Sequence, residues 1–108
     1  MKIKFYAHAS FRFEADGIAV VTDPYSPATS GFEPIHEAAD LVIMSSRTDD
    51  FHSDPSHVEG NPTVVNALEL GPEGTVVGGV PIRGFEAYES KVFDYQGELG
   101  RDPDANAL

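Results

Sequence analysis

Residues 39–52 of this chain read ADLVIMSSRTDDFH, and this stretch decides the fold. Its apolar run, Leu41–Met44, predicts a short strand that is buried on both faces of a sheet. The run passes directly into the polar residues 45–52. Folds that contain parallel strands commonly place chemistry where the chain leaves a buried strand for such a loop. Residues 45–52 are therefore the first candidate for a functional site.

Strand patterns stand on both sides of this stretch. Residues 2–6 and 10–14 alternate in polarity, and residues 18–21 form a nearly continuous apolar run. Asp16-Gly17 predicts a type I′ hairpin turn before that run, because both residues tolerate positive φ. Further strands are expected over 63–65, 75–78 and 80–85.

Two short helical turns are also considered, one around residues 35–39 and one opened by Asp54 as N-cap with Pro55 at its first position. No long helical pattern occurs. The sequence therefore predicts a β-rich α+β protein with a mostly antiparallel or mixed sheet and few short helices.

The length and composition of the chain exclude several classes of protein. The chain has 108 residues and 41% hydrophobic residues, which suits one folded domain rather than a disordered segment. No apolar run approaches the roughly 20 residues of a membrane span. With 18 acidic and 7 basic residues, the net charge is -11, which argues against nucleic-acid binding. The chain has no cysteine, so disulfides and thiolate ligands are excluded.

From these features we expect a cytoplasmic protein that binds neither membranes nor nucleic acids. Residues 1–95 are expected to form the β-rich domain. Residues 96–108 are rich in glycine, proline and charge, which predicts a loosely held tail.

The densest polar cluster contains Asp49, Asp50, His52 and Asp54. Carboxylates and an imidazole together could ligate a divalent cation. No established metal motif has this spacing, however, so spacing alone favours a solvated acidic loop.

The other histidines have plainer interpretations. His8 lies between two strand patterns, where a hydrogen-bonded structural role is most common. His36 and His57 fall in predicted loops or turns and are expected to face solvent.

The order of these features resembles the metallo-β-lactamase fold superfamily, and most closely its branch of small metal-dependent hydrolases that includes the ascorbate-6-phosphate lactonases. The similarity rests on His8-Ala9-Ser10, Thr22-Asp23-Pro24 and residues 39–45. It implies an αββα sandwich, of which this chain would form the N-terminal half. It also implies a metal that lowers the pKa of a bound water, which then attacks an ester, lactone or phosphodiester.

The metal motif of that branch, His-x-His-x-Asp-His, is degenerate in this sequence. Its histidines fall on Ser46, Thr48 and Phe51, and its aspartate falls on Asp50, while His52 stands one position late. A standard dinuclear zinc site cannot be built from these residues.

The resemblance nevertheless implies a reduced ligand set. Asp50 would be the retained metal ligand or the catalytic base, with His52 and Glu89 as substitute ligands. His8 and Asp23 would not bind the metal themselves but would orient its ligands through hydrogen bonds. Such a set could hold zinc, iron or manganese weakly, and a chain without any metal is an equal alternative.

Three functions stay open at this point. The first is a hydrolase relative with impaired or absent hydrolysis, and the second is a non-catalytic interaction or structural module on the same fold. A third is a domain that binds carbohydrates or small acids through Arg47 and Arg83, although isolated arginines in an acidic chain more often form surface ion pairs.

Half of a sandwich would leave an apolar sheet face or a sheet edge uncovered. We therefore expect a homodimer, or a partner that supplies the missing half.

Overall fold

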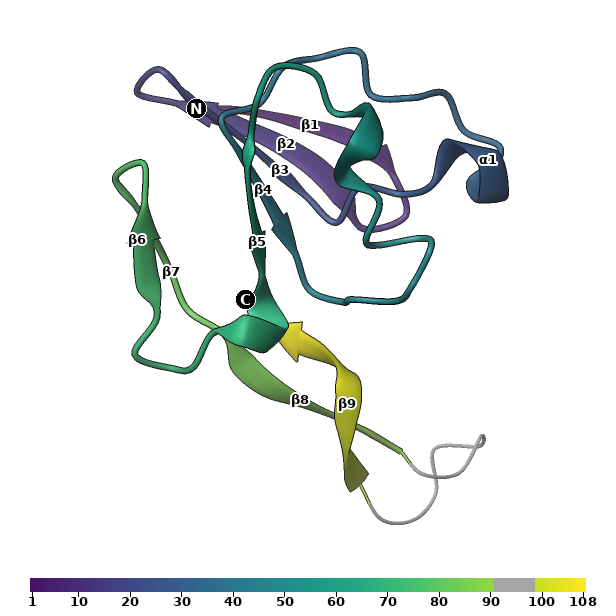
Figure 1. The fold of residues 1–108 in the computed structure, drawn as a ribbon, viewed down its shortest axis with the longest axis vertical. Coiled ribbons are helices and arrows are strands. Elements are labelled where there is room, and N and C mark those ends of the chain that lie inside the picture. Colours follow the sequence, from purple (N-terminus) through teal and green to yellow (C-terminus); the bar gives the residue numbers. More distant parts are fainter. Residues whose placement is uncertain (91–98) are drawn as a thin grey trace.

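The computed structural model describes residues 1–90 and 99–108 and contains a five-stranded sheet and two β-hairpins (Figure 1). In spatial order the sheet comprises β1 (Lys2–Ala7), β2 (Ser10–Ala15), β3 (Ile18–Thr22), β4 (Leu41–Met44) and β5 (Thr63–Asn66). Strands β1, β2 and β3 are antiparallel, whereas β3, β4 and β5 are parallel. The fold is thus β-rich with a mixed sheet, as the sequence predicted.

The remaining elements are short. One hairpin pairs β6 (Thr75–Val77) with β7 (Val80–Ile82), and the other pairs β8 (Phe85–Ser90) with β9 (Leu99–Ala107). No helix within the described ranges has the length and hydrophobicity that crossing a bilayer requires. The helical segments are α1 (Pro27–Ser30) and the 3₁₀ turns η1 (Pro55–His57) and η2 (Ala67–Glu69).

Local sequence signals account for several of these boundaries. The predicted turn between β2 and β3 is confirmed, with φ of 52° at Asp16 and 78° at Gly17. Asp54 caps η1 through a hydrogen bond from the Ser56 amide to its Oδ1 (3.1 Å). The helical turn considered around residues 35–39 is not present, and the short helix instead follows the Ser26 cap in α1.

The strand expected over residues 80–85 is divided between β7 and β8. The division comes at Gly84, whose backbone approaches η2 so closely that an added Cβ would lie 2.6 Å from the Ala67 carbonyl oxygen. The chain therefore changes direction there and begins a second hairpin.

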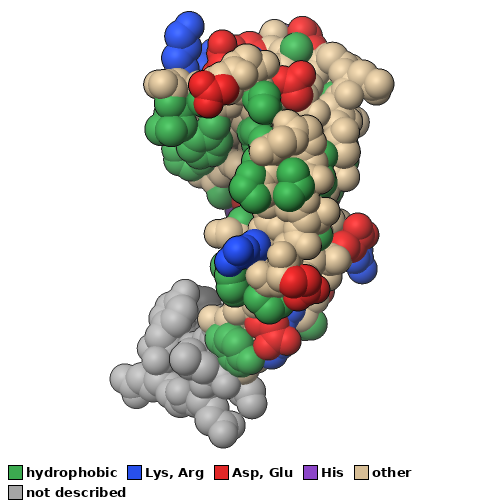
Figure 2. Space-filling view, turned by 90° about the vertical axis from the view of Figure 1, so that its left-hand side faces the viewer, with side chains coloured by type: hydrophobic (Ala, Val, Ile, Leu, Met, Phe, Trp, Pro, Cys, Tyr) green, Lys and Arg blue, Asp and Glu red, His purple; other side chains and the backbone are tan. Residues whose placement is uncertain are grey.

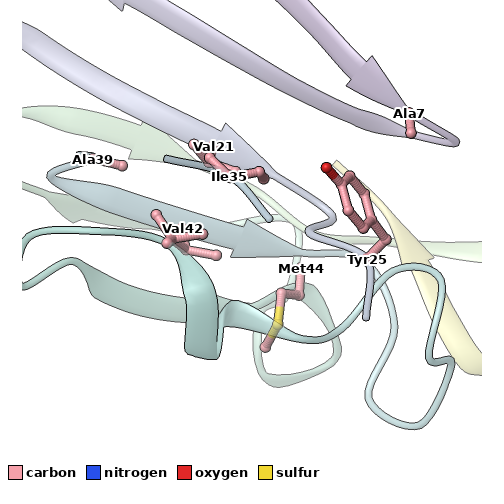
Figure 3. Close-up of a cluster of buried hydrophobic side chains, with 8 residues drawn as sticks. Ala7, Val21, Tyr25, Ile35, Ala39, Val42 and Met44 are labelled. Carbon is pink, nitrogen blue, oxygen red and sulfur yellow. The ribbon is translucent and has the colours of Figure 1, made fainter. Parts of the chain in front are cut away.

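Two cores cover the two faces of β4, all four residues of which are buried. This confirms the prediction from the Leu41–Met44 run. On one face, the segment from residue 23 to 40 and η1 pack on the sheet (Figure 3), giving a cluster of Ala7, Val21, Tyr25, Ile35, Ala39, Val42, Met44 and Val58. On the other face, the β6–β7 hairpin packs through Ile82, with Val77 and Val80, on Leu41, Ile43, Val20 and Val65.

The expectation that His57 faces solvent is wrong, whereas His36 is indeed exposed. His57 is half-buried at the edge of the first core. The Ile35 amide donates to its Nδ1 (2.9 Å), and its Nε2 lies 2.7 Å from the Tyr25 carbonyl oxygen. The imidazole therefore joins two parts of the loop that covers the sheet.

The predicted domain boundary at residue 95 lies outside the described residues and stays a prediction. The described part of the segment predicted as a tail forms β9. Near its end, the Asn106 amide donates to the Ser45 carbonyl (2.9 Å), and Asn106 Nδ2 donates to the Ala67 carbonyl (2.9 Å). These bonds place the end of β9 beside the ends of β4 and β5.

Candidate functional site

Polar residues that follow three neighbouring parallel strands meet at one edge of the sheet. Asp23 follows β3, Ser45 and Ser46 follow β4, and Asn66 ends β5. Asn66 Nδ2 donates to the Ser46 carbonyl (3.0 Å). Carboxyl ends of parallel strands commonly carry binding or catalytic residues, so this edge is the candidate site.

Asp23 is the buried carboxylate of this edge, with 9% of its surface exposed. Its Oδ1 accepts a hydrogen bond from the Ser45 amide (2.6 Å) and its Oδ2 one from Ser45 Oγ (2.9 Å). Burial raises the pKa of the Asp23 carboxyl, and the two bonds from Ser45 offset that effect only in part. Asp23 therefore ties the loop after β4 to the end of β3.

Asp49 and His52 form a pair within that loop. His52 Nδ1 lies 2.7 Å from Asp49 Oδ2, and the Phe51 amide donates to Asp49 Oδ1 (2.8 Å). Partial burial raises the pKa of the Asp49 carboxyl, but the hydrogen bonds from Phe51 and His52 outweigh burial and hold that pKa below its usual value. An ionised Asp49 accepts from Nδ1 of His52, and Nε2 of the same ring has no hydrogen-bond partner among the described residues.

A pocket of about 450 Å³ lies between this loop and β9. Hydroxyl groups, carboxylates and one imidazole line it, and three carboxylates make its surroundings negative. The lining residues are Ser45, Ser46, Thr48, Asp49, His52, Asp102, Asp104 and Ala105.

The predicted metal ligands Asp50, His52 and Glu89 stay a prediction as a set, because the structure describes the side chains of only the first two. Asp50 is exposed and does not line the pocket, and its carbonyl oxygen accepts from the Ser26 amide (2.6 Å). The backbone of Glu89 pairs with Gly100 between β8 and β9, and its side chain lies outside the described part of the chain. His52 is paired with Asp49 instead. The spacing of three residues within one loop is the sequence feature from which this pair could have been predicted.

His8 lies at the tight turn between β1 and β2, with a positive φ of 52°. It is exposed, and its ring packs on two aromatic rings, with centroid distances of 4.8 Å to Phe51 and 5.4 Å to Phe32. The role of His8 in orienting a metal ligand stays a prediction. Arg47, considered above for acid binding, lies 3.6 Å from Glu69 in an exposed ion pair.

The residues that the structure describes do not fit a dinuclear zinc centre on their own. A catalytic zinc ion commonly takes three protein ligands and keeps one position open. In the part of the chain that the structure describes, no group of three His, Cys, Asp or Glu side chains is arranged to hold a metal ion. His52 offers one nitrogen, and both oxygens of Asp23 are bonded to Ser45.

Comparisons with known proteins agree with this architecture. A solved structure from Thermotoga maritima, classed as a zinc-dependent hydrolase of the metallo-β-lactamase superfamily, matches with a TM-score of 0.57 and 30% sequence identity. The match covers 86% of this chain but 39% of that one, so the chain spans well under half of that protein's length. A search of curated proteins gives no significant match. Because the family model described as "Beta-lactamase superfamily domain" matches residues 2–102, and a solved metallo-β-lactamase-superfamily structure matches most of the same chain, this protein belongs to that superfamily.

Proposed function

We propose that this chain is a divergent metallo-β-lactamase superfamily member in which zinc-dependent hydrolysis is strongly impaired or lost. The observation that carries the proposal is the loop after β4. At the positions where the resemblance expects histidines, this loop has Ser46, Thr48 and Phe51.

The geometry of the same loop supports the proposal. Its one imidazole is bonded to Asp49 through Nδ1, and Asp50 is exposed and outside the pocket. A zinc ion that activates water needs several converging protein ligands to hold it. Without them, the step that generates hydroxide at neutral pH has no support from these residues.

The alternative is a non-catalytic interaction module on the same fold. One specific observation favours it, namely the large apolar side chains of Ile3 and Phe5 on β1, which are 61% and 57% exposed. The two proposals are compatible, because a chain that has lost hydrolysis can retain a binding surface.

Zinc content tests the main proposal. After incubation with excess zinc and dialysis, we expect the chain to keep far less than one zinc ion per molecule, and to show no zinc-stimulated hydrolysis of a lactone or of bis(4-nitrophenyl) phosphate. The Thermotoga maritima protein is treated in parallel for comparison. Two retained zinc ions together with zinc-stimulated hydrolysis by the wild-type chain would overturn the proposal.

Restoring histidines gives a matched test at two exposed positions. Thr48→His/Phe51→His adds imidazoles at motif positions beside His52, and we expect its zinc affinity to rise at least about tenfold, since each added ligand strengthens a transition-metal site. Arg47→His/Ser56→His adds the same number of imidazoles at exposed positions that are not ligand positions of the motif, and it is the control. An equal gain in both variants, measured by isothermal titration calorimetry, would show that the motif positions are not what the chain lacks.

A further inference from the structure

The side chain of His57 holds two backbone groups of residues 23–40, the covering segment that packs on one face of the sheet (Figure 1). Its Nδ1 accepts a hydrogen bond from the Ile35 amide (2.9 Å), and its Nε2 donates to the Tyr25 carbonyl oxygen (2.7 Å). An imidazole accepts at one nitrogen and donates at the other only in its neutral form. The two bonds together therefore require an uncharged His57.

Protonation of His57 removes the acceptor of the Ile35 amide. In the imidazolium both ring nitrogens carry a hydrogen, so the Nδ1 hydrogen would point at the amide hydrogen of Ile35. Ile35 is 1% exposed, so water has little access to the amide that loses its partner. A buried donor without an acceptor is strongly unfavourable. The closed position of the covering segment thus disfavours a charged His57.

The carboxylates nearest to His57 in the sequence are already engaged. Asp54, which caps η1, accepts through Oδ1 from the amide and the hydroxyl of Ser56. Glu59 lies 3.8 Å from His36 in an exposed pair. Within residues 1–90 and 99–108, no carboxylate forms an ion pair with His57 that would compensate for the added charge.

The other groups around the ring do not compensate for the charge either. The ring of Tyr25 packs on the imidazole, with centroids 5.5 Å apart, and burial raises the pKa of the Tyr25 phenol, which therefore stays neutral. Glu33 lies beyond Tyr25 and is exposed, and its carbonyl accepts from the Tyr25 hydroxyl. The strands beneath contribute apolar side chains, namely Val21, Val42 and Met44.

The overall charge of the chain acts on both positions of the covering segment alike. The net charge is -11, and Figure 2 shows acidic side chains at several places on one face of the molecule. A field from charges spread over the whole chain favours protonation of a histidine whether the segment is closed or released. The bond from the Ile35 amide exists only in the closed position. This bond therefore determines which position the charged form of His57 prefers.

We propose that His57 is a pH-sensitive switch that holds residues 25–35 on the sheet at neutral pH and releases them on mild acidification. Imidazole side chains commonly change charge between pH 5 and 8. Because the closed position needs the neutral ring, its stability is full above this range and decreases as the pH falls through it. The inference rests on the bonds of His57 and does not depend on the loss of zinc-dependent hydrolysis.

Release of this segment would also affect the candidate site. The Ser26 amide donates to the Asp50 carbonyl (2.6 Å), and the Asp54 amide donates to the Pro24 carbonyl (2.8 Å). These bonds connect the covering segment to the polar loop after β4, part of which lines the pocket. The switch therefore couples acidification to the mobility of that loop.

Hydrogen exchange of backbone amides, followed by NMR between about pH 5 and 7.5, tests the proposal on the intact chain. After correction for the intrinsic pH dependence of exchange, the protection factor of the Ile35 amide is expected to fall about tenfold on acidification, because its hydrogen bond is lost. Protection of the Val42 amide, in the central strand β4, should change less than about twofold. The ring carbon shifts of His57 should titrate with the same midpoint as the loss at Ile35.

Two variants provide matched controls. His57→Asn keeps an acceptor near the position of Nδ1 but does not titrate, so its Ile35 protection should be equal at both ends of the pH range. His36→Ala removes an exposed histidine of the covering segment and should keep the pH dependence of the wild type.

The two wild-type signals decide the proposal even without the Asn variant. A His57 ring that protonates with no loss of protection at Ile35, or that stays neutral down to pH 5, would overturn it. So would a parallel loss at Val42, which would indicate global unfolding, or an unchanged pH dependence in His57→Asn.

Discussion

Replacing His57 by alanine is expected to lower the free energy of unfolding by about 3 kcal/mol, since two partly buried backbone groups lose their partners at about 1–3 kcal/mol each. The Ile35 amide donates to Nδ1 of His57 at 2.9 Å, so this nitrogen carries no hydrogen in the bonded tautomer. Nε2 therefore carries the hydrogen and donates to the Tyr25 carbonyl at 2.7 Å. Urea denaturation at neutral pH measures the loss.

The location of His57 explains the size of the effect. Ile35 is 1% exposed and Tyr25 is 3% exposed, and both belong to the core under β3 and β4. The imidazole ring also packs on the Tyr25 ring, with centroids 5.5 Å apart. Loss of the imidazole thus releases both ends of the loop that covers this core.

Three further variants separate the hydrogen bonds from general loss of a side chain. Asn at position 57 places an acceptor near the position of Nδ1, and Gln places a donor near that of Nε2, so each is expected to restore part of the stability. His36→Ala is the control, because the His36 side chain is 71% exposed, and it should change the free energy of unfolding by less than about 0.5 kcal/mol. A loss at His36 as large as that at His57 would contradict the assignment.

The sequence signals that succeeded were local ones. Asp16-Gly17 predicted its turn from the φ values that these residues accept, and Asp54 predicted the cap of η1 from its hydrogen-bonding side chain. The uninterrupted run Leu41–Met44 predicted burial on both faces. Each of these signals involves at most a few consecutive residues, so no knowledge of the tertiary structure was needed.

The signals that failed involve partners distant in the chain. The ring of His57 bonds residues 22 and 32 positions away, and nothing near His57 in the sequence indicates either partner. In the loop after β4, the metal-binding role that the family motif assigns to Asp50 stays a prediction, and His52 pairs with Asp49. Side-chain direction in an irregular loop depends on its anchors, here the bonds from Ser45 to Asp23, which a linear motif does not describe.

Asp23 carries the second large prediction, and its substitution by alanine is expected to cost about 4 kcal/mol. The partly buried amide and hydroxyl of Ser45 would lose their acceptors on Asp23, at about 1–3 kcal/mol for each unsatisfied group. Position 23 also has a positive φ of 40°, which for alanine costs about 1–2 kcal/mol. Asp23→Gly removes that backbone cost and should therefore be less harmful than Asp23→Ala in thermal or urea denaturation.

The pH dependence of the same site distinguishes charge from hydrogen bonding. Because burial raises the pKa of Asp23 in the folded state, the folded chain binds this proton more tightly than the unfolded chain does. The contribution of Asp23 to stability is therefore fullest below its unfolded pKa of about 3.9 and decreases as the pH rises through the higher folded value. Asp23→Asn keeps an acceptor for the Ser45 amide but has no charge to lose or gain.

The stability difference between wild type and Asp23→Asn should thus favour the wild type most at the acidic end and narrow toward neutral pH. The other carboxylates of this chain titrate in both proteins, so their contribution to the pH dependence of stability cancels in the difference. Urea denaturation of both proteins at intervals from about pH 3.5 to 7 gives the curve, since that interval brackets the usual range of an Asp carboxyl. A stability difference that widens in favour of the wild type as the pH rises would contradict this prediction. It would mean that the fold stabilises the carboxylate form of Asp23, and that the hydrogen bonds from Ser45 outweigh burial in setting its pKa.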